Sequence, residues 1–168
     1  KANVRDYRAF ALEALSIVGQ RPISFEVFSD PWLEMEAQAV EIASWGQNVY
    51  VKIPVTNTKG EFSGPLINRL SSAGVQVNVT ALMTPDQVQQ VANRLADDTD
   101  SFVSLFAGRV ADTGRDPIPV MAQAVENLRP RPRAQLIWAS PRELLNIFHA
   151  GSVGCHIITV NSDVLAKL

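Results

Sequence analysis

The feature of this sequence that most constrains its fold is a strict alternation of strand-like and helix-like segments. Short runs rich in β-branched residues alternate with segments in which apolar residues recur every three or four positions. We expect strands at residues 23–28, 49–56, 75–80, 102–107, 135–139 and 155–160. Because neighbouring parallel strands require a crossover connection, this order predicts a parallel sheet with helices packed outside it.

Capping signals predict where the helices begin and end. The first helix is expected from Asp6 to Val18, and Gly19 ends it. Further helices are each predicted to start at a capping residue followed by proline, at Asp30-Pro31, Thr84-Pro85, Asp116-Pro117 and Ser140-Pro141. Two of these starts also fit the capping-box pattern, because Gln87 and Glu143 stand three residues after the cap.

One strand carries a lysine inside an otherwise apolar run, from Val49 to Thr56. Alternation places Lys52 on the same face as Tyr50 and Pro54, opposite a face of valine and isoleucine. Such a strand is predicted to be buried in a parallel sheet, which would lower the pKa of the Lys52 ammonium and free its amine. A free amine attacks carbonyl compounds. The alternative is a structural lysine whose head group reaches solvent.

Polar residues at the strand ends distinguish between two parallel folds, the doubly wound sheet and the β/α barrel. No glycine-rich phosphate or dinucleotide fingerprint follows a strand, which disfavours the doubly wound sheet. Polar side chains instead lie on or just past successive strands, at Glu26, Lys52, Asn78, Thr80, Ser104 and Arg109. In a barrel such residues converge on an active site. The sequence therefore predicts a (β/α)8 TIM barrel, of which this chain supplies about six strands.

Four motifs, which follow one another along the chain in the family's order, resemble those of the transaldolase family. Residues 51–56 resemble its lysine strand, and residues 77–81 resemble its Asn-Val-Thr strand. Residues 103–110 are similar to its Val-Ser-Pro-Phe-Val-Gly-Arg stretch, with Leu105 in place of the proline. Residues 23–27 are similar to its Val-Ser-x-Glu-Val strand. The resemblance extends from about residue 22 to residue 160. Members are (β/α)8 barrels that act on sugar phosphates through a lysine Schiff base.

The resemblance implies a role for each candidate residue. Lys52 would attack the carbonyl of a ketose phosphate, and Glu26 and Thr80 would hold a water that transfers protons. Substrate contacts are implied for Asn78, Ser104, Phe106, Arg109, Ser140 and Arg142, with the phosphate near the arginines. Structural alternatives remain open: a buried Glu26–Lys52 ion pair, a surface salt bridge at Arg109, and turn or strand-end roles for Asn78 and Thr80.

Besides Leu105, the chain departs from the family pattern in two places. The family has two strands before the one at Ile23, which carry an acid–base aspartate and a substrate-binding asparagine. In addition, Ala139-Ser140 is followed directly by Pro141-Arg142, whereas the phosphate loop of the family has a longer insert before the proline. We therefore expect residues 1–168 to form a single barrel domain that is incomplete at both ends and belongs to a longer protein, because an open sheet edge would expose unpaired backbone.

Transaldolase activity, the transfer of a dihydroxyacetone unit between sugar phosphates, is the leading functional hypothesis. The first alternative is a lyase similar to fructose-6-phosphate aldolase. Glu26 and Phe106 favour transfer, because the lyase branch carries glutamine and tyrosine at these places. The second alternative is a barrel remnant that binds a sugar phosphate without catalysis. The family resemblance further implies a homo-oligomer in the pentose phosphate pathway that needs no cofactor and no metal.

Composition limits the remaining function classes. The formal net charge is −2 and Cys155 is the only cysteine, which argues against a nucleic-acid partner, a disulfide framework and a zinc cluster. No apolar run reaches the roughly 18 residues of a membrane span. These features predict a cytoplasmic enzyme whose partners are small sugar phosphates.

Overall fold

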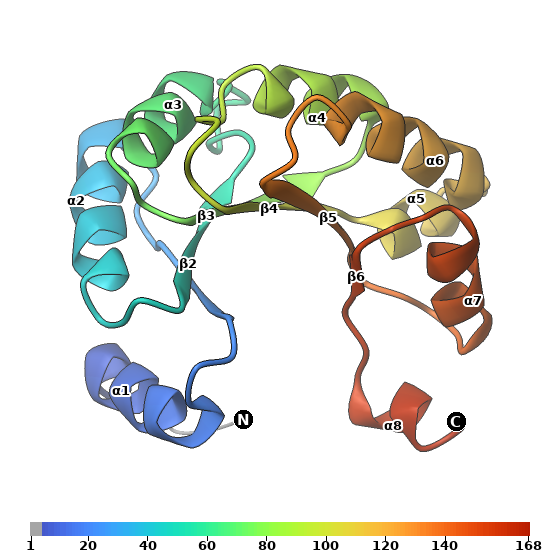
Figure 1. The fold of residues 1–168 in the computed structure, drawn as a ribbon, viewed down its shortest axis with the longest axis horizontal. Helices are drawn as coiled ribbons and strands as arrows, with labels where there is room; N and C mark the ends of the chain where they lie inside the picture. The colour runs from blue at the N-terminus through green and yellow to red at the C-terminus, as the bar shows by residue number, and fades with distance from the viewer. Residues whose placement is uncertain (1–4) are drawn as a thin grey trace.

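The computed structural model describes residues 5–168, which contain one sheet of six parallel strands in the order β1 to β6. The strands are β1 Ile23–Glu26, β2 Val49–Pro54, β3 Val77–Leu82, β4 Ser101–Leu105, β5 Ala134–Trp138 and β6 Ile157–Ile158. Neighbours in sequence are neighbours in the sheet, and the sheet curves into an arc (Figure 1). The arc is a half-barrel, so the predicted fold class, six strands of a (β/α)8 barrel, is confirmed.

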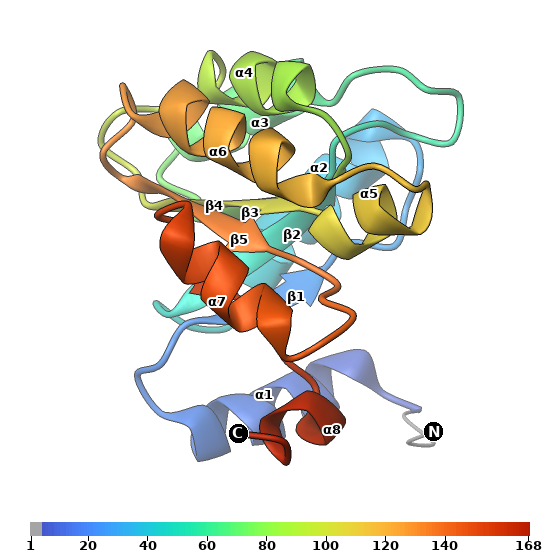
Figure 2. The ribbon, with the colours of Figure 1, turned by 90° about the vertical axis from the view of Figure 1, so that its right-hand side faces the viewer.

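Helices cover the convex side of the arc (Figure 1). They are α2 Trp32–Ala43, α3 Gly64–Ser72, α4 Pro85–Ala92, α6 Pro117–Leu128 and α7 Leu145–Ser152. Helices α1 Tyr7–Val18 and α8 Ser162–Leu165 lie at the two ends of the arc, and the short α5 Ala107–Asp112 follows β4. Figure 2 shows α3, α4 and α6 as a layer above the strands. Within residues 5–168, no helix is long and apolar enough to cross a membrane.

The alternation of side chains along the strands separates an apolar outer face from a largely polar inner face. The outer residues Val51, Val79 and Leu136 are fully buried beneath the helices. The residues between them point into the hollow of the arc, and Lys52 on β2 is paired in register with Asn78 on β3. Burial of the outer face holds the sheet and helices together, since each large apolar side chain removed from water contributes about 1.5–3 kcal/mol.

Two of the predicted helix starts are wrong. Asp30 does not cap α2, because its carboxylate accepts hydrogen bonds from the backbone and hydroxyl of Thr58 at 2.7 and 2.9 Å. Ser140 does not cap α7, because its φ of 57° is left-handed, whereas an N-cap residue needs an extended backbone. The predicted capping box at Thr84 and the predicted cap at Asp116 are confirmed.

Strand boundaries also differ from the prediction near the carboxyl end of the sheet. Strand β3 extends to Leu82 through a register shift, with Ala81 at a φ of 64°. Strand β4 ends at Leu105, and α5, which was not predicted, begins two residues later at Ala107. The last strand contains only Ile157 and Ile158. These ends are set by pairing with neighbouring strands, which local sequence patterns do not encode.

Candidate active site

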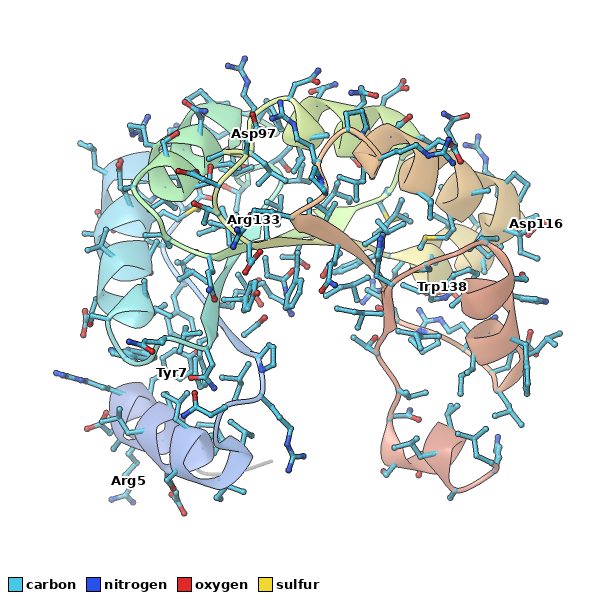
Figure 3. The ribbon with its side chains drawn as sticks, in the orientation of Figure 1. Arg5, Tyr7, Asp97, Asp116, Arg133 and Trp138 are labelled. Atoms are coloured by element: carbon cyan, nitrogen blue, oxygen red, sulfur yellow. The ribbon has the colours of Figure 1, made fainter. Side chains whose placement is uncertain are left out.

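The inner side of the half-barrel encloses a cavity of about 570 Å³, which we call the inner cavity. Figure 3 shows side chains that project from the strands into the inner side of the arc, whereas Trp138 lies toward α7. Most of the residues singled out in the sequence line the inner cavity: Lys52, Asn78, Thr80, Ser104, Phe106 and Ser140. They lie on β2, β3 and β4 or just past the ends of β4 and β5, so curvature of the sheet is what brings them together.

Lys52 is partly exposed to the inner cavity, and the prediction that its strand is buried on both faces is wrong for this side chain. The outer face of β2 is fully buried at Val51 and Ile53, while the inner face opens onto the hollow. Among residues 5–168, no side chain forms a hydrogen bond or an ion pair with the Lys52 amine. The amine is therefore available to a ligand that enters the inner cavity.

A chain of hydrogen bonds crosses the inner face beside Lys52. The Ser104 hydroxyl donates to Asn78 Oδ1 at 2.8 Å, and Asn78 Nδ2 donates to Ser24 Oγ at 2.9 Å. Asn78 and Ser104 are buried, and Ser24 also lines the inner cavity. Ser24 was not singled out in the sequence. Its place two residues before Glu26, on the same face of the strand, is the signal that could have identified it.

Thr80 is buried on the inner face, with 3% of its surface exposed. Its hydroxyl oxygen has no hydrogen-bond partner among the described residues. A buried hydroxyl without a partner costs free energy, so such groups occur where a water or a ligand completes the site. Thr80 is therefore ready to hold a water or a substrate oxygen.

Glu26 stands at the end of β1 as the register partner of Lys52, and its side chain is exposed. In the described part of the chain, no ion pair joins its carboxylate to Lys52, so the alternative of a buried structural pair is not what the structure contains. The backbone N–H of Glu26 donates to the Tyr7 hydroxyl at 3.1 Å, which ties β1 to α1. Glu26 flanks the inner cavity and does not line it.

The two candidate arginines lie outside the lining of the inner cavity. Arg142 forms an ion pair with Asp112 at the end of α5, and its Nε donates to Asp112 Oδ1 at 3.0 Å. This hydrogen bond holds the pKa of the Asp112 carboxyl below its usual range, and the charge of Arg109 acts in the same direction. Arg109 is exposed on α5, and the structure of residues 5–168 gives it no hydrogen bond or ion pair.

Gly108 joins the arginine-bearing helix to the loop after β5. A Cβ at Gly108 would overlap the carbonyl oxygen of Ser140, and the Gly108 N–H donates to Ala139 O at 3.3 Å. The approach of these two segments places Arg109 and Ser140 at the same edge of the sheet. Glycine is required here because no other residue permits backbone contact this close.

An aromatic pair from β2 and β4 lies toward the amino ends of the strands, and its Phe102 lines the inner cavity. The rings of Tyr50 and Phe102 stack with centroids 3.9 Å apart and planes 9° from parallel. Burial raises the pKa of the Tyr50 hydroxyl, and the nearby Asp100 charge adds to this shift. The apolar pair and the polar residues beyond it divide the inner face into an apolar part and a polar part.

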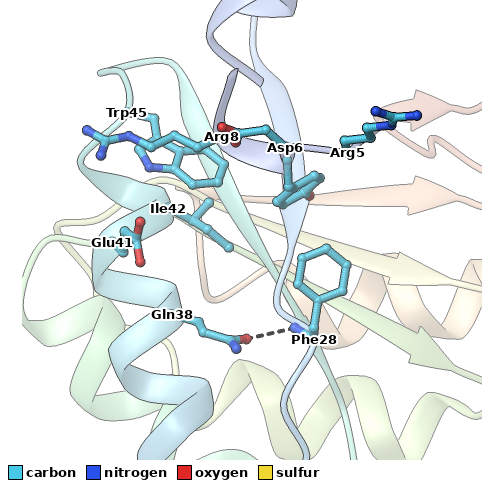
Figure 4. A pocket seen from close by; sticks show the side chains of 9 residues that line it. Arg5, Asp6, Arg8, Phe28, Gln38, Glu41, Ile42 and Trp45 are labelled. Atoms are coloured by element: carbon cyan, nitrogen blue, oxygen red, sulfur yellow. Dashed lines mark hydrogen bonds between the residues drawn. The ribbon is translucent and has the colours of Figure 1, made fainter. Parts of the chain in front are cut away.

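A second cavity of about 410 Å³ lies between α1 and α2 (Figure 4). It is lined by Arg5, Tyr7, Phe28 and Trp45, among others, and Gln38 Oε1 on its wall accepts a hydrogen bond from the Phe28 N–H at 2.8 Å. None of the candidate residues lines it. The inner cavity is thus the better candidate for an active site.

Comparison with known sequences gives consistent matches. The model of the Transaldolase/Fructose-6-phosphate aldolase family matches residues 7–168. A Dehalococcoides mccartyi protein named "Probable transaldolase" is 32% identical over 100% of this chain and 74% of its own length. Proteins with the same name from Streptococcus equi subsp. zooepidemicus and Methanococcus maripaludis are 34% and 31% identical, over 98% and 100% of this chain and 73% and 74% of their own lengths.

Comparison with solved structures supports the fold alone. A mandelate oxidase variant with an FMN adduct superposes with a TM-score of 0.60 and 13% sequence identity. The match covers 89% of this chain and 51% of the oxidase. At this identity the likeness concerns the arrangement of strands and helices and carries nothing about ligands or chemistry.

Proposed function

This chain belongs to the Transaldolase/Fructose-6-phosphate aldolase family, and from this premise we propose that it is a transaldolase that moves a dihydroxyacetone unit between sugar phosphates. The proposal places the reaction in the inner cavity and makes Lys52 the nucleophile. The observation that carries it is the Lys52 amine, which has no protein partner among residues 5–168 and shares one cavity with Asn78, Thr80 and Ser104.

The chemistry begins with attack of the Lys52 amine on the carbonyl carbon of a ketose phosphate. Loss of water from the adduct gives an iminium ion, which is an electron sink. The hydroxyl two carbons away from the iminium carbon then loses its proton. The bond between that hydroxyl-bearing carbon and the carbon next to the iminium breaks. An aldehyde phosphate leaves, and the bonding electrons form an enamine on Lys52. An acceptor aldehyde adds to the enamine, and water hydrolyses the new iminium to regenerate the amine.

Each proton transfer needs a base and a positioned water. In this proposal, the unpartnered Thr80 hydroxyl holds the water in the inner cavity, and the Glu26 carboxylate receives the proton from it. The absence of a Glu26–Lys52 ion pair within the described chain supports this assignment of roles to Thr80 and Glu26, because a direct pair would keep the lysine charged. Asn78 and Ser104, buried beside Lys52, would bind the hydroxyls of the substrate.

Reduction with borohydride in the presence of a ketose phosphate tests the imine. We expect a stable adduct on the peptide that contains Lys52 and irreversible loss of activity. Lys52→Arg should abolish both, because a guanidinium stays protonated and cannot attack. Lys59→Arg, at an exposed lysine in the loop after β2, is the matched control and should retain both. Turnover without an adduct at Lys52 would contradict the mechanism.

An acceptor assay separates transfer from its alternatives. A transaldolase should consume the ketose phosphate quickly only when an aldehyde acceptor is present. Release of free dihydroxyacetone at the same rate without acceptor would indicate the aldolase-like lyase. Binding of a sugar phosphate without turnover would indicate a non-catalytic barrel.

A further inference from the structure

The hydrogen bond between Ser24 and Asn78 joins two strands that are not neighbours. Ser24 lies on β1 and Asn78 on β3, and β2 runs between them. Adjacent strands lie about 4.8 Å apart, so these side chains meet above β2, on the inner face. At this place β2 presents Tyr50 and Lys52 to the inner face.

Strand register fixes where the hydrogen bond crosses β2. Ser24 is level with Tyr50, whereas Asn78 is level with Lys52. The Ser24–Asn78 bond therefore runs diagonally over β2, between the Tyr50 and Lys52 side chains. The bond lies between the Lys52 side chain and the aromatic pair of Tyr50 and Phe102. The space that remains for the Lys52 side chain is therefore toward the carboxyl ends of the strands.

The same bond fixes the orientation of the Asn78 amide. Its oxygen accepts from Ser104 at 2.8 Å and one N–H donates to Ser24 at 2.9 Å, which leaves the second N–H for a ligand in the inner cavity. Without an acceptor at residue 24 the amide could rotate about its terminal torsion, because such torsions have broad minima. Ser24 is then the group that keeps the amide nitrogen turned toward β1 and its oxygen toward β4.

We propose that Ser24 is a positioning residue for the reaction, which holds the Asn78 amide in one orientation and directs Lys52 toward the substrate. This inference rests on the proposed Schiff-base function. Ser24 itself need not contact the reacting atoms. Its effect reaches the substrate through Asn78, so the effect must disappear when Asn78 is removed.

A double-mutant cycle tests this dependence. Ser24→Ala should lower kcat about 3- to 10-fold, as expected for one lost hydrogen bond, with a smaller change in KM. In an Asn78→Ala background the same substitution should have no further effect. Ser24→Thr, which keeps a hydroxyl acceptor, should restore kcat. An equal loss of kcat in both backgrounds, or no loss in either, would overturn the inference.

Ser101→Ala is the matched control, because Ser101 is a buried serine on the outer face of β4. Among residues 5–168, its hydroxyl bonds only to a backbone carbonyl, at 3.4 Å. It should leave kcat unchanged. The side-chain amide resonances of Asn78, observed by NMR without ligand, provide a readout that needs no activity. They should shift in Ser24→Ala and remain in place in Ser101→Ala, and unshifted resonances in Ser24→Ala would overturn the inference. A wild-type protein without turnover would refute the proposed function instead.

Discussion

At the scale of single residues, the inner face combines a buried polar group without a partner and polar groups that are paired. The Thr80 hydroxyl is buried without a partner in the described part of the chain. The Lys52 amine is partly exposed to the inner cavity and has no side-chain partner among residues 5–168. Asn78, in contrast, is held on both sides by Ser104 and Ser24. Polar groups with a hydrogen-bond partner therefore stand next to polar groups without one around a single cavity, as in a site preorganised for a ligand.

Thr80→Val should separate stability from activity. The substitution removes an unpartnered buried hydroxyl and keeps the shape of the side chain, so the free energy of unfolding should stay the same or rise by about 1 kcal/mol. Turnover should fall at least about 10-fold, because the water for proton transfer loses its ligand. Chemical denaturation and steady-state kinetics measure the two effects. A large loss of stability with unchanged turnover would contradict this assignment.

Arg109→Ala should weaken the binding of phosphorylated donors. Loss of one charge-assisted hydrogen bond costs about 1.5–3 kcal/mol, which corresponds to a rise in KM of about 10- to 100-fold. The KM of an unphosphorylated analogue should change much less. Arg115→Ala, at an exposed arginine beyond α5, is the control and should leave both KM values unchanged. Equal changes for both donors would argue against a phosphate contact.

At the scale of elements, the packing of α5 against the loop after β5 determines the shape of the arginine-bearing edge. Ser140 adopts a left-handed backbone and reaches the backbone of Gly108. Asn146, in the first turn of α7, accepts hydrogen bonds from the N–H groups of Arg142 and Glu143 in the preceding loop, at 2.8 and 3.2 Å. Two segments that are distant in the sequence thus fix each other's conformation.

Gly108→Ala should therefore be destabilising. The added methyl group would overlap the Ser140 carbonyl and force the two segments apart, at a cost of about 1–3 kcal/mol in the free energy of unfolding. Gly151→Ala is the control, because nothing lies within 4 Å of a Cβ there and the residue is in α7. That change should stabilise the protein by about 0.5–1 kcal/mol. Urea unfolding curves distinguish the two variants.

At the scale of the whole molecule, the two faces of the sheet differ in composition and in what they contact. The outer face and the helices form the main apolar core, whereas the inner face supplies the polar groups of the cavity. The arginines of the stretch from Arg129 to Arg133 are each engaged in an ion pair, with Glu126, Asp97 and Asp100. This basic stretch is therefore a connector whose charges are paired at the surface.

Leu136→Ala should affect stability without affecting the site. Leu136 is fully buried on the outer face of β5, so its truncation should lower the free energy of unfolding by about 2–5 kcal/mol. KM and kcat at a temperature where the variant is folded should stay close to those of the wild type. Leu145→Ala is the control, because Leu145 is 51% exposed on α7, and it should change stability by less than about 0.5 kcal/mol.

The sequence alone determined the elements and their faces. The periods of strands and helices are local, so the alternation of Tyr50, Lys52 and Pro54 with valine and isoleucine was enough to assign an inner and an outer face. The parallel direction of the strands followed from the need for crossover helices, and the family motifs identified Lys52, Asn78 and Ser104 as a group.

Only the tertiary structure decided which partner each polar group takes. Asp30 binds Thr58 instead of capping α2, Arg142 pairs with Asp112, and Ser24 reaches Asn78 across β2. Each of these partners lies at least 28 positions away in the chain. The physical reason is that hydrogen bonds are short and directional, so the choice among competing partners depends on positions that exist only after the sheet has curved.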